Sequence, residues 1–235
     1  MRTSIGIIYF DEKLNPDRDH HSVSESLLNI WLKFYKQSNT GLKPVLLTDK
    51  STNIPKVWKY EVVRINDDQP PYKRDVLHKV GWLKAQCYNY IGRCLILDLD
   101  CIIVNSIDEI DEINTSFAMP KEKNSTFLHK ILDLKEKYNG GCIFQNTDLI
   151  FPMFKKYWIR ESEHAKITYL DEIIFTKICQ QLNGVILSQK YNISWDIGYT
   201  NHAICQYFNP ESKIIHFHGY RKNELNTFLK SIIKL

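Results

Sequence analysis

Two aspartates, Asp98 and Asp100, stand one residue apart directly after a run of four apolar residues, 94–97. Such a continuous apolar run is typical of a strand that is buried on both faces of a sheet. Because a strand directs residues i and i+2 to the same side, we expect the two carboxylates to share one target while Leu99 points away. Carboxylate oxygens suit a hard divalent cation, Mg²⁺ or Mn²⁺, which would in turn bridge phosphate oxygens. The alternative is that the two side chains cap a turn or pair with nearby Lys and Arg residues.

The elements that must position this pair alternate between strands and helices, which indicates an α/β sheet. The patterns predict strands at residues 4–10, 44–48, 57–65, 94–97, 116–119, 142–145 and 213–217. They predict one helix after the capping-box spacing of Ser22 and Glu25, and further helices at 75–90, 148–158, 171–182 and 224–233. Ligands of open α/β sheets usually bind at the carboxyl ends of the strands, so we expect the aspartate pair at the functional edge.

Length and composition limit the possible classes of protein. A chain of 235 residues, 43% hydrophobic and 25% charged, suits one globular domain. No apolar run approaches the roughly 20 residues of a membrane span, and no secretory signal precedes the first strand, so a cytoplasmic location is expected. The net charge of +4 is too small to name an acidic partner. The six cysteines form no CxxC pair, which favours reduced core residues over disulfides or a zinc site.

Residues 95–104 resemble the Asp-x-Asp strand of GT-A glycosyltransferases, especially family 8, the glycogenin and lipopolysaccharide galactosyltransferase type. Four further segments occur in the order found in that family. Residues 139–144 resemble the Asn-x-Gly segment of the sugar pocket, and Asp171-Glu172 resembles an Asp-Gln pair that opens a helix beside the donor sugar. Residues 190–192 with Trp195 resemble a Lys-Tyr-Asn segment, and 215–222 resemble the closing His-Phe-x-Gly-x-x-Lys segment.

The resemblance implies a single GT-A domain over residues 1–235, with a Rossmann-like mixed sheet flanked by helices. Residues 1–104 would form the nucleotide-binding half, and residues 105–235 the sugar and acceptor half. It also implies a metal-dependent transferase of the hexosyltransferase type. Such an enzyme moves a sugar from a nucleoside diphosphate donor, here expected to be a UDP-sugar, to an acceptor with retention of the anomeric configuration.

The resemblance also assigns roles to single residues. Asp98, Asp100 and His216 would hold Mn²⁺ or Mg²⁺, the imidazole suiting Mn²⁺ better than Ca²⁺. Lys222 would neutralise the diphosphate, including the leaving group. Donor contacts are assigned to Tyr9 and Phe10 (stacking on the base), Lys84, Asp98, Asn139, Gly140, Gly141, Asp171, His218, Gly219 and Lys222.

Asp171 and Glu172 are the predicted catalytic residues. Glu172 departs from the glutamine usual in the family. Its carboxylate could act as a nucleophile, stabilise an oxocarbenium-like transition state, or bind a sugar hydroxyl. The chain also lacks the Pro-Trp that often follows the closing lysine, so the loop after Lys222 is expected to differ.

Each assignment has a structural alternative. The imidazole of His216 could simply form its hydrogen bonds at a strand end, and Gly140-Gly141 could be an ordinary turn that uses φ > 0. Asp171 could cap its helix, and Lys222 could be a solvated surface lysine.

Other functions also stay open. A sugar-1-phosphate nucleotidyltransferase is disfavoured because no glycine-rich loop follows the first strand. A non-catalytic nucleotide-sugar binder and a metal-dependent nuclease are further alternatives.

The acceptor is open between a glycan, a glycolipid, a protein and a modified nucleic acid. Residues 120–125 and 158–169 are candidate lids, and the basic C-terminal helix either packs on the domain or touches a membrane surface.

Overall fold

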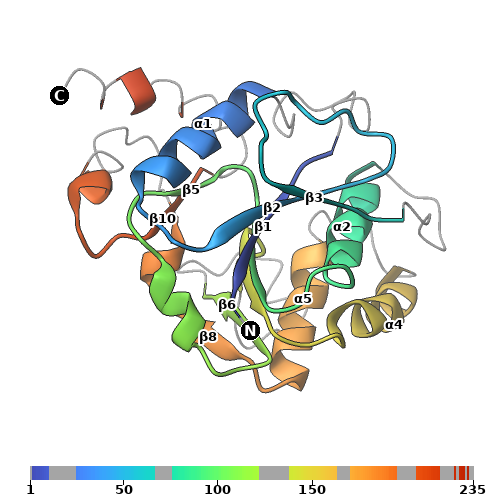
Figure 1. The fold of residues 1–235 in the computed structure, drawn as a ribbon. Coiled ribbons are helices and arrows are strands. Elements are labelled where there is room, and N and C mark those ends of the chain that lie inside the picture. Colours follow the sequence, from blue (N-terminus) through green and yellow to red (C-terminus); the bar gives the residue numbers. More distant parts are fainter. Residues whose placement is uncertain are drawn as a thin grey trace.

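A seven-stranded mixed sheet forms the centre of the protein, in the order β3-β2-β1-β4-β7-β6-β8 (Figure 1). The structure is a computed structural model that describes residues 2–10, 25–66, 76–121, 138–162, 170–194, 205–217, 225, 228–230 and 232 (the backbone only for 76–80, 161, 162 and 194). The strands of this sheet are β1 (Ser4–Ile8), β2 (Lys43–Thr48), β3 (Glu61–Arg64), β4 (Cys94–Leu97), β6 (Phe117–Pro120), β7 (Cys142–Gln145) and β8 (Val185–Leu187). A smaller sheet has the order β5-β10-β9 and consists of β5 (Cys101–Ile103), β10 (Ile214–His216) and β9 (Ile193–Ser194).

Helices cover both faces of the large sheet (Figure 1). The helix α1 (Glu25–Gln37) and the small sheet lie against one face, whereas α2 (Val76–Cys87), α4 (Ile150–Ser162) and α5 (Leu170–Gln181) lie against the other. Side chains of β4 alternate between the two cores: Leu95 and Leu97 pack on the α1 side, and Cys94 and Ile96 pack on the opposite side. This double burial explains why the strand reads as an uninterrupted apolar run.

Strand β1 pairs in parallel with β2 on one side and with β4 on the other. The chain goes from β1 to β2 and β3 on one side and returns through α2 to β4 on the other side of β1. This reversal of strand order creates a switch point, where α/β sheets bind ligands beyond the carboxyl ends of their strands. At this edge Ile7 lies opposite Leu97, the residue before Asp98. Strand β7 runs antiparallel to β4, so its first residues come to the same edge.

The predicted single α/β domain with a mixed sheet is confirmed, with local differences in the strands, among them β5, which was not predicted as a strand. The strand expected at 57–65 is confined to β3, because a turn in which Trp58 N–H donates to Pro55 C=O (3.0 Å) occupies the preceding residues. Strands β8 and β9 were not predicted; they are three and two residues long, and Val185 and Ile186 of β8 are exposed. Ser22 of the predicted capping box lies outside the described residues, and α1 is described from Glu25.

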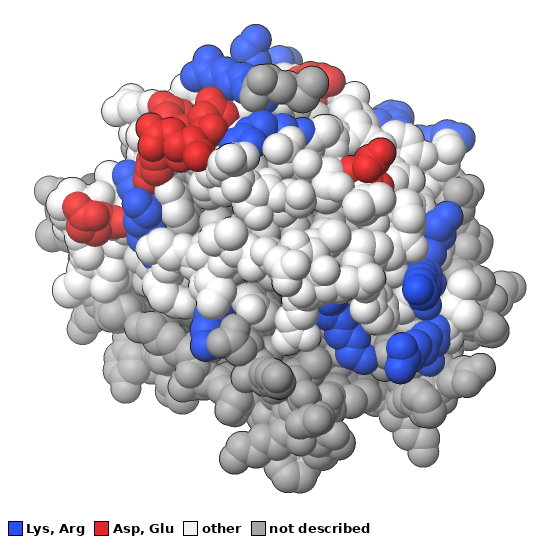
Figure 2. Space-filling view, turned by 90° about the horizontal axis from the view of Figure 1, so that it is seen from below, with Lys and Arg blue, Asp and Glu red and all other residues white. Residues whose placement is uncertain are grey.

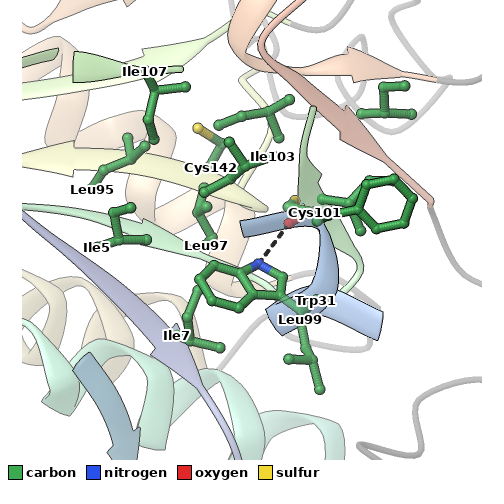
Figure 3. Packing of buried hydrophobic residues seen from close by; sticks show 14 of the residues in the cluster. Ile5, Ile7, Trp31, Leu95, Leu97, Leu99, Cys101, Ile103, Ile107 and Cys142 are labelled. Atoms are coloured by element: carbon green, nitrogen blue, oxygen red, sulfur yellow. Dashed lines mark hydrogen bonds between the residues drawn. The ribbon is translucent and has the colours of Figure 1, made fainter. Parts of the chain in front are cut away.

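The small sheet is attached to α1 through Trp31. Its indole N–H donates a 3.0 Å hydrogen bond to the carbonyl of Cys101, at the start of β5 (Figure 3). Leu99, two residues earlier, is buried in the same core, as expected for the residue between the two aspartates. The backbone that carries Asp98 and Asp100 is therefore held by core packing.

Two described residues near the C-terminus pack on the domain. Leu225 and Phe228 are fully buried, and the Phe228 ring stacks on Phe34 of α1 at 5.9 Å.

All six cysteines lie within the described residues and are free thiols; five are buried and Cys205 is exposed. Among the described helices none is long and apolar enough to cross a membrane. Figure 2 shows most of the acidic side chains of this face at its upper left, with Lys and Arg beside them and also along the right and lower edge, so this face carries no continuous charge of one sign.

Candidate active site

Asp98 and Asp100 lie in a tight turn and not on one face of a strand. Strand β4 ends at Leu97, and the N–H of Cys101 donates to the carbonyl of Asp98 at 2.9 Å, which closes a β-turn over residues 98–101. Strand alternation therefore does not set the direction of these side chains, and a target shared by the two carboxylates stays a prediction. In the structure Asp98 faces α2, whereas Asp100 faces His216.

Lys84, on the last turn of α2, is buried beneath Asp98. Its ammonium group donates to Oδ1 of Asp98 at 2.6 Å and to the carbonyl of Gly140 at 2.7 Å. Burial alone would lower the pKa of Lys84, but the charges of Asp98, Asp171 and Glu172 outweigh it and raise that pKa. Lys84 is therefore an internal cation that holds the Asp98 side chain, which is the pairing with a nearby lysine that the sequence left open as an alternative. A contact between Lys84 and the donor stays a prediction.

Asp171 and Glu172 approach the same lysine from the first turn of α5. Burial raises the pKa of Asp171 against the opposing charge of Lys84. Oε1 of Glu172 accepts a 3.3 Å hydrogen bond from the N–H of Gly140. Three segments predicted separately from the sequence, around residues 98, 140 and 171, thus meet at one buried cation.

Asp100 and His216 face one another on the other side of the turn. Nε2 of His216 lies 3.5 Å from Oδ1 of Asp100, and both side chains are about 95% buried, with exposures of 5% and 6%. This separation exceeds a normal N–H···O hydrogen bond but brings both atoms within reach of a single cation. The small sheet fixes the geometry, because His216 pairs with Cys101 across β10 and β5, and Phe217 N–H donates to Asp100 C=O at 3.0 Å.

One group of possible metal ligands occurs among the residues that the structure describes: Asp100, Cys101 and His216, whose ligand atoms lie within 4.8 Å of one another. Burial raises the pKa of Cys101 well above its usual value, and its thiol contacts the carbonyl of Gly141 at 3.2 Å. A buried neutral thiol is a poor ligand for a hard cation. The donor set that remains, one carboxylate and one imidazole, can hold a divalent cation.

The surrounding charge also fits a cation. Lys84 is the buried ammonium of the site, and it already faces the carboxylates of Asp98, Asp171 and Glu172. Asp100 adds a further buried carboxylate a few residues away. A divalent ion beside Asp98 and Asp100 would offset the negative charge of these carboxylates.

The turn formed by Asn139, Gly140 and Gly141 provides space for these side chains. Oδ1 of Asn139 accepts a 2.9 Å hydrogen bond from Gly141 N–H, and Gly141 C=O accepts from Asp98 N–H at 2.9 Å. A Cβ added at Gly141 would lie 2.1 Å from Cε1 of His216. Neither glycine has a left-handed φ, so the interpretation as a turn that needs φ > 0 is wrong. Gly141 is required because the imidazole packs directly on its backbone.

Gly81 is a site residue that the sequence analysis missed. It lies inside α2, where a Cβ would come within 2.9 Å of the Cβ of Asp171. The absence of a side chain therefore allows the first turn of α5 to approach α2. A glycine inside a helix lowers the stability of that helix by about 1 kcal/mol relative to alanine. Its presence in a helical sequence pattern was therefore the signal that could have pointed to a close contact at Gly81.

The remaining predicted residues differ in how far the structure places them. Tyr9 and Phe10 follow β1 and are buried, with 7% and 4% exposure, one in each core. Stacking of either ring on a base stays a prediction. The other predicted residues, Trp195, His218, Gly219 and Lys222, lie outside the described residues.

Comparison with known proteins identifies the fold. Neither a protein-family model nor a curated protein sequence matches the chain. The structure is similar to the galactosyltransferase LgtC in complex with donor and acceptor sugar analogues, with a TM-score of 0.63 and 12% identity over 97% of this chain and 96% of that one. It is also similar to mouse xyloside xylosyltransferase 1 (TM-score 0.58, 12% identity, 92% and 97% covered). A third similar structure is the glycosyltransferase GlyE of Streptococcus pneumoniae TIGR4 (TM-score 0.59, 13% identity, 100% and 64% covered). The chain therefore has the GT-A glycosyltransferase fold.

Proposed function

We propose that the protein is a metal-dependent glycosyltransferase that moves a sugar from a nucleoside diphosphate donor, a UDP-sugar, to an acceptor with retention of configuration. The observation that carries this proposal is the buried approach of Asp100 to His216, 3.5 Å apart, at the ligand-binding edge of a GT-A sheet and in the same turn as Asp98. The similarity to LgtC, described as a galactosyltransferase, supports a hexosyltransferase of the family 8 type.

The two halves of the chain have separate roles in this proposal. Residues 1–104 carry β1, β2 and β4 and would hold the nucleotide, and residues 105–235 carry Gly140, Glu172 and His216 and would hold the sugar and the acceptor. A protein, glycan, glycolipid or modified nucleic acid stays open as acceptor, and a cytoplasmic location stays a prediction.

Asp98, Asp100 and His216 would hold Mn²⁺ or Mg²⁺, which when bound neutralises charge on the diphosphate. In the transfer, the bond between the anomeric carbon and the diphosphate oxygen breaks, and its electron pair leaves with the nucleotide. The acceptor hydroxyl forms the new bond, and its proton passes to the departing phosphate. Glu172, held by Gly140 N–H, would face the positive charge that develops on the sugar ring.

The test is a panel of nucleotide-sugars with Mn²⁺, in which nucleoside diphosphate release is measured for the wild type, Asp100→Asn and Asp148→Asn. Asp148 is an exposed carboxylate just before α4 and serves as the control. We expect release from at least one UDP-sugar, a loss of roughly 100-fold or more in Asp100→Asn, and no change in Asp148→Asn. No release from any donor would overturn the transferase, and full activity of Asp100→Asn would overturn its metal dependence.

A further inference from the structure

A buried amide, Asn192, contacts the imidazole of His216 on the side opposite to Asp100. Oδ1 of Asn192 lies 2.9 Å from Nδ1 of His216, and both residues are buried, with exposures of 1% and 4%. An amide oxygen can only accept a hydrogen bond, so Nδ1 is the nitrogen that carries the proton. In the neutral imidazole Nε2 then carries a lone pair, which is directed to the side where Oδ1 of Asp100 lies at 3.5 Å.

The chain fixes the position of Asn192 through its backbone. Its N–H donates to the carbonyl of Gln189 at 3.0 Å, which closes the short helix η3 (Gln189–Tyr191). The next residues form β9, which pairs in parallel with β10 so that Ser194 lies opposite His216. The neighbouring Lys213 N–H donates to Lys190 C=O at 2.9 Å, so η3 and β10 are joined on both sides of the contact.

The imidazole has few other orientations available. Gly141 lies against its Cε1 edge so closely that a single added carbon would approach to 2.1 Å. Rotation of the ring by half a turn would replace Nδ1 with a carbon beside the Asn192 oxygen and would leave a buried amide oxygen unsatisfied, which is costly. Packing by Gly141 and the hydrogen bond from Nδ1 thus select one ring orientation and one tautomer.

We infer that Asn192 is a positioning residue that holds His216 as the Nδ1–H tautomer, with Nε2 prepared as a ligand for the divalent cation that Asp100 shares. The inference rests on the proposed metal dependence and adds to it the group that orients the histidine ligand. Metal-binding histidines commonly donate their second N–H to such a partner, and loss of that partner weakens metal binding by roughly 10–100-fold. Asn192 contacts neither sugar nor nucleotide in this scheme and acts only through His216.

The experiment measures Mn²⁺ affinity directly, by water-proton relaxation in a titration with Mn²⁺ alone, for the wild type, Asn192→Ala and Asn192→Asp. Aspartate is a conservative replacement because its carboxylate also accepts from Nδ1–H. Asn105→Ala is the matched control, since Asn105 donates to the carbonyls of Asn209 (3.2 Å) and Ser212 (2.7 Å) beside the same small sheet and makes no contact with His216 among the described hydrogen bonds. Circular dichroism verifies that each variant is folded.

We expect Asn192→Ala to weaken Mn²⁺ binding by roughly 10–100-fold, Asn192→Asp to stay within about three-fold of the wild type, and Asn105→Ala to bind as the wild type does. Long-range ¹H–¹⁵N spectra of metal-free protein should show His216 protonated at Nδ1 in the wild type and a shift towards the Nε2–H form in Asn192→Ala. Equal affinity of the wild type and Asn192→Ala, or protonation at Nε2 in the wild type, would overturn the inference alone. A wild type that binds no Mn²⁺ would instead overturn the metal site of the proposed function, and the inference with it.

Discussion

Nζ of Lys84 lies 2.6 Å from Oδ1 of Asp98, and the lysine end of this ion pair is almost completely buried, with 7% exposure. The lysine comes from the last turn of α2 and the aspartate from the turn after β4, so the pair joins a helix to the functional edge of the sheet. The carbonyl of Gly140 accepts a second hydrogen bond from the same ammonium group. One buried cation thus connects α2, β4 and the turn before β7.

Replacement of Lys84 by Met should destabilise the protein by about 3 kcal/mol, because it leaves a carboxylate and a carbonyl without their partner. We take the lower end of the range for a broken buried pair since Asp98 keeps 34% exposure. Urea unfolding at neutral pH measures the change. Lys190→Met is the control: Lys190 pairs with Glu109, each side chain is about one third exposed, and Glu109 would keep its second partner Lys213. Its loss should cost no more than about 1 kcal/mol. Equal effects of the two substitutions would contradict the structural role of Lys84.

Gly141→Ala should disrupt the metal site more than the fold. The new methyl group would lie 2.1 Å from Cε1 of His216, so the imidazole must move away from its position beside Asp100. We expect Mn²⁺ affinity to fall by at least about 10-fold and stability to fall by about 1–3 kcal/mol. Gly140→Ala is the comparison, since its methyl group would contact the flexible Glu172 side chain at 3.1 Å. Gly141→Ala protein that binds Mn²⁺ as well as Gly140→Ala would show that His216 is not the ligand.

Glu172→Gln should separate the two roles of this side chain. Glutamine keeps an oxygen that can accept from Gly140 N–H, so the local structure and the melting temperature should stay unchanged. If the negative charge stabilises the transition state, kcat for nucleoside diphosphate release should fall by roughly 10-fold or more with little change in KM. The measurement is steady-state kinetics with the donor found in the panel. A change confined to KM would assign Glu172 to binding of a sugar hydroxyl.

Asp111 gives a prediction for stability against pH. Burial alone would raise its pKa, but hydrogen bonding from Thr3 N–H (2.7 Å) and the charges of Arg2 and Arg93 outweigh this and lower it. A carboxyl group with a lowered pKa in the folded state adds stability above its unfolded pKa, about 3.9, and loses that stability as the pH falls through the lower folded value. The wild type should therefore exceed Asp111→Asn in stability at pH 7, and this difference should shrink below about pH 4. Urea unfolding at several pH values measures the difference, and a gap that is constant down to pH 3 would be the contrary result.

The sequence by itself determined the order and type of most elements. Hydrophobic periodicity and apolar runs depend on neighbouring residues, so β4, α2 and α5 were predicted within a few residues of their observed bounds. The same local patterns identified Asp98 and Asp100, because two acidic residues directly after a buried apolar run stand out from their surroundings. Asp171 and His216 became candidates only through the ordered resemblance to GT-A glycosyltransferases. Short edge strands such as β8, with exposed Val185 and Ile186, give no such local signal.

Only the tertiary structure decided how these residues combine. The turn over 98–101 sends Asp98 to Lys84 and Asp100 to His216, a division that alternation along a strand cannot predict. The contact between Asn192 and His216 spans 24 residues, and it exists because β9 and β10 pair in one register. Gly81 and Gly141 matter because side chains from other segments fill the space that they leave. Close contacts of this kind depend on long-range packing and strand register, whereas the sequence pattern reports burial and periodicity one element at a time.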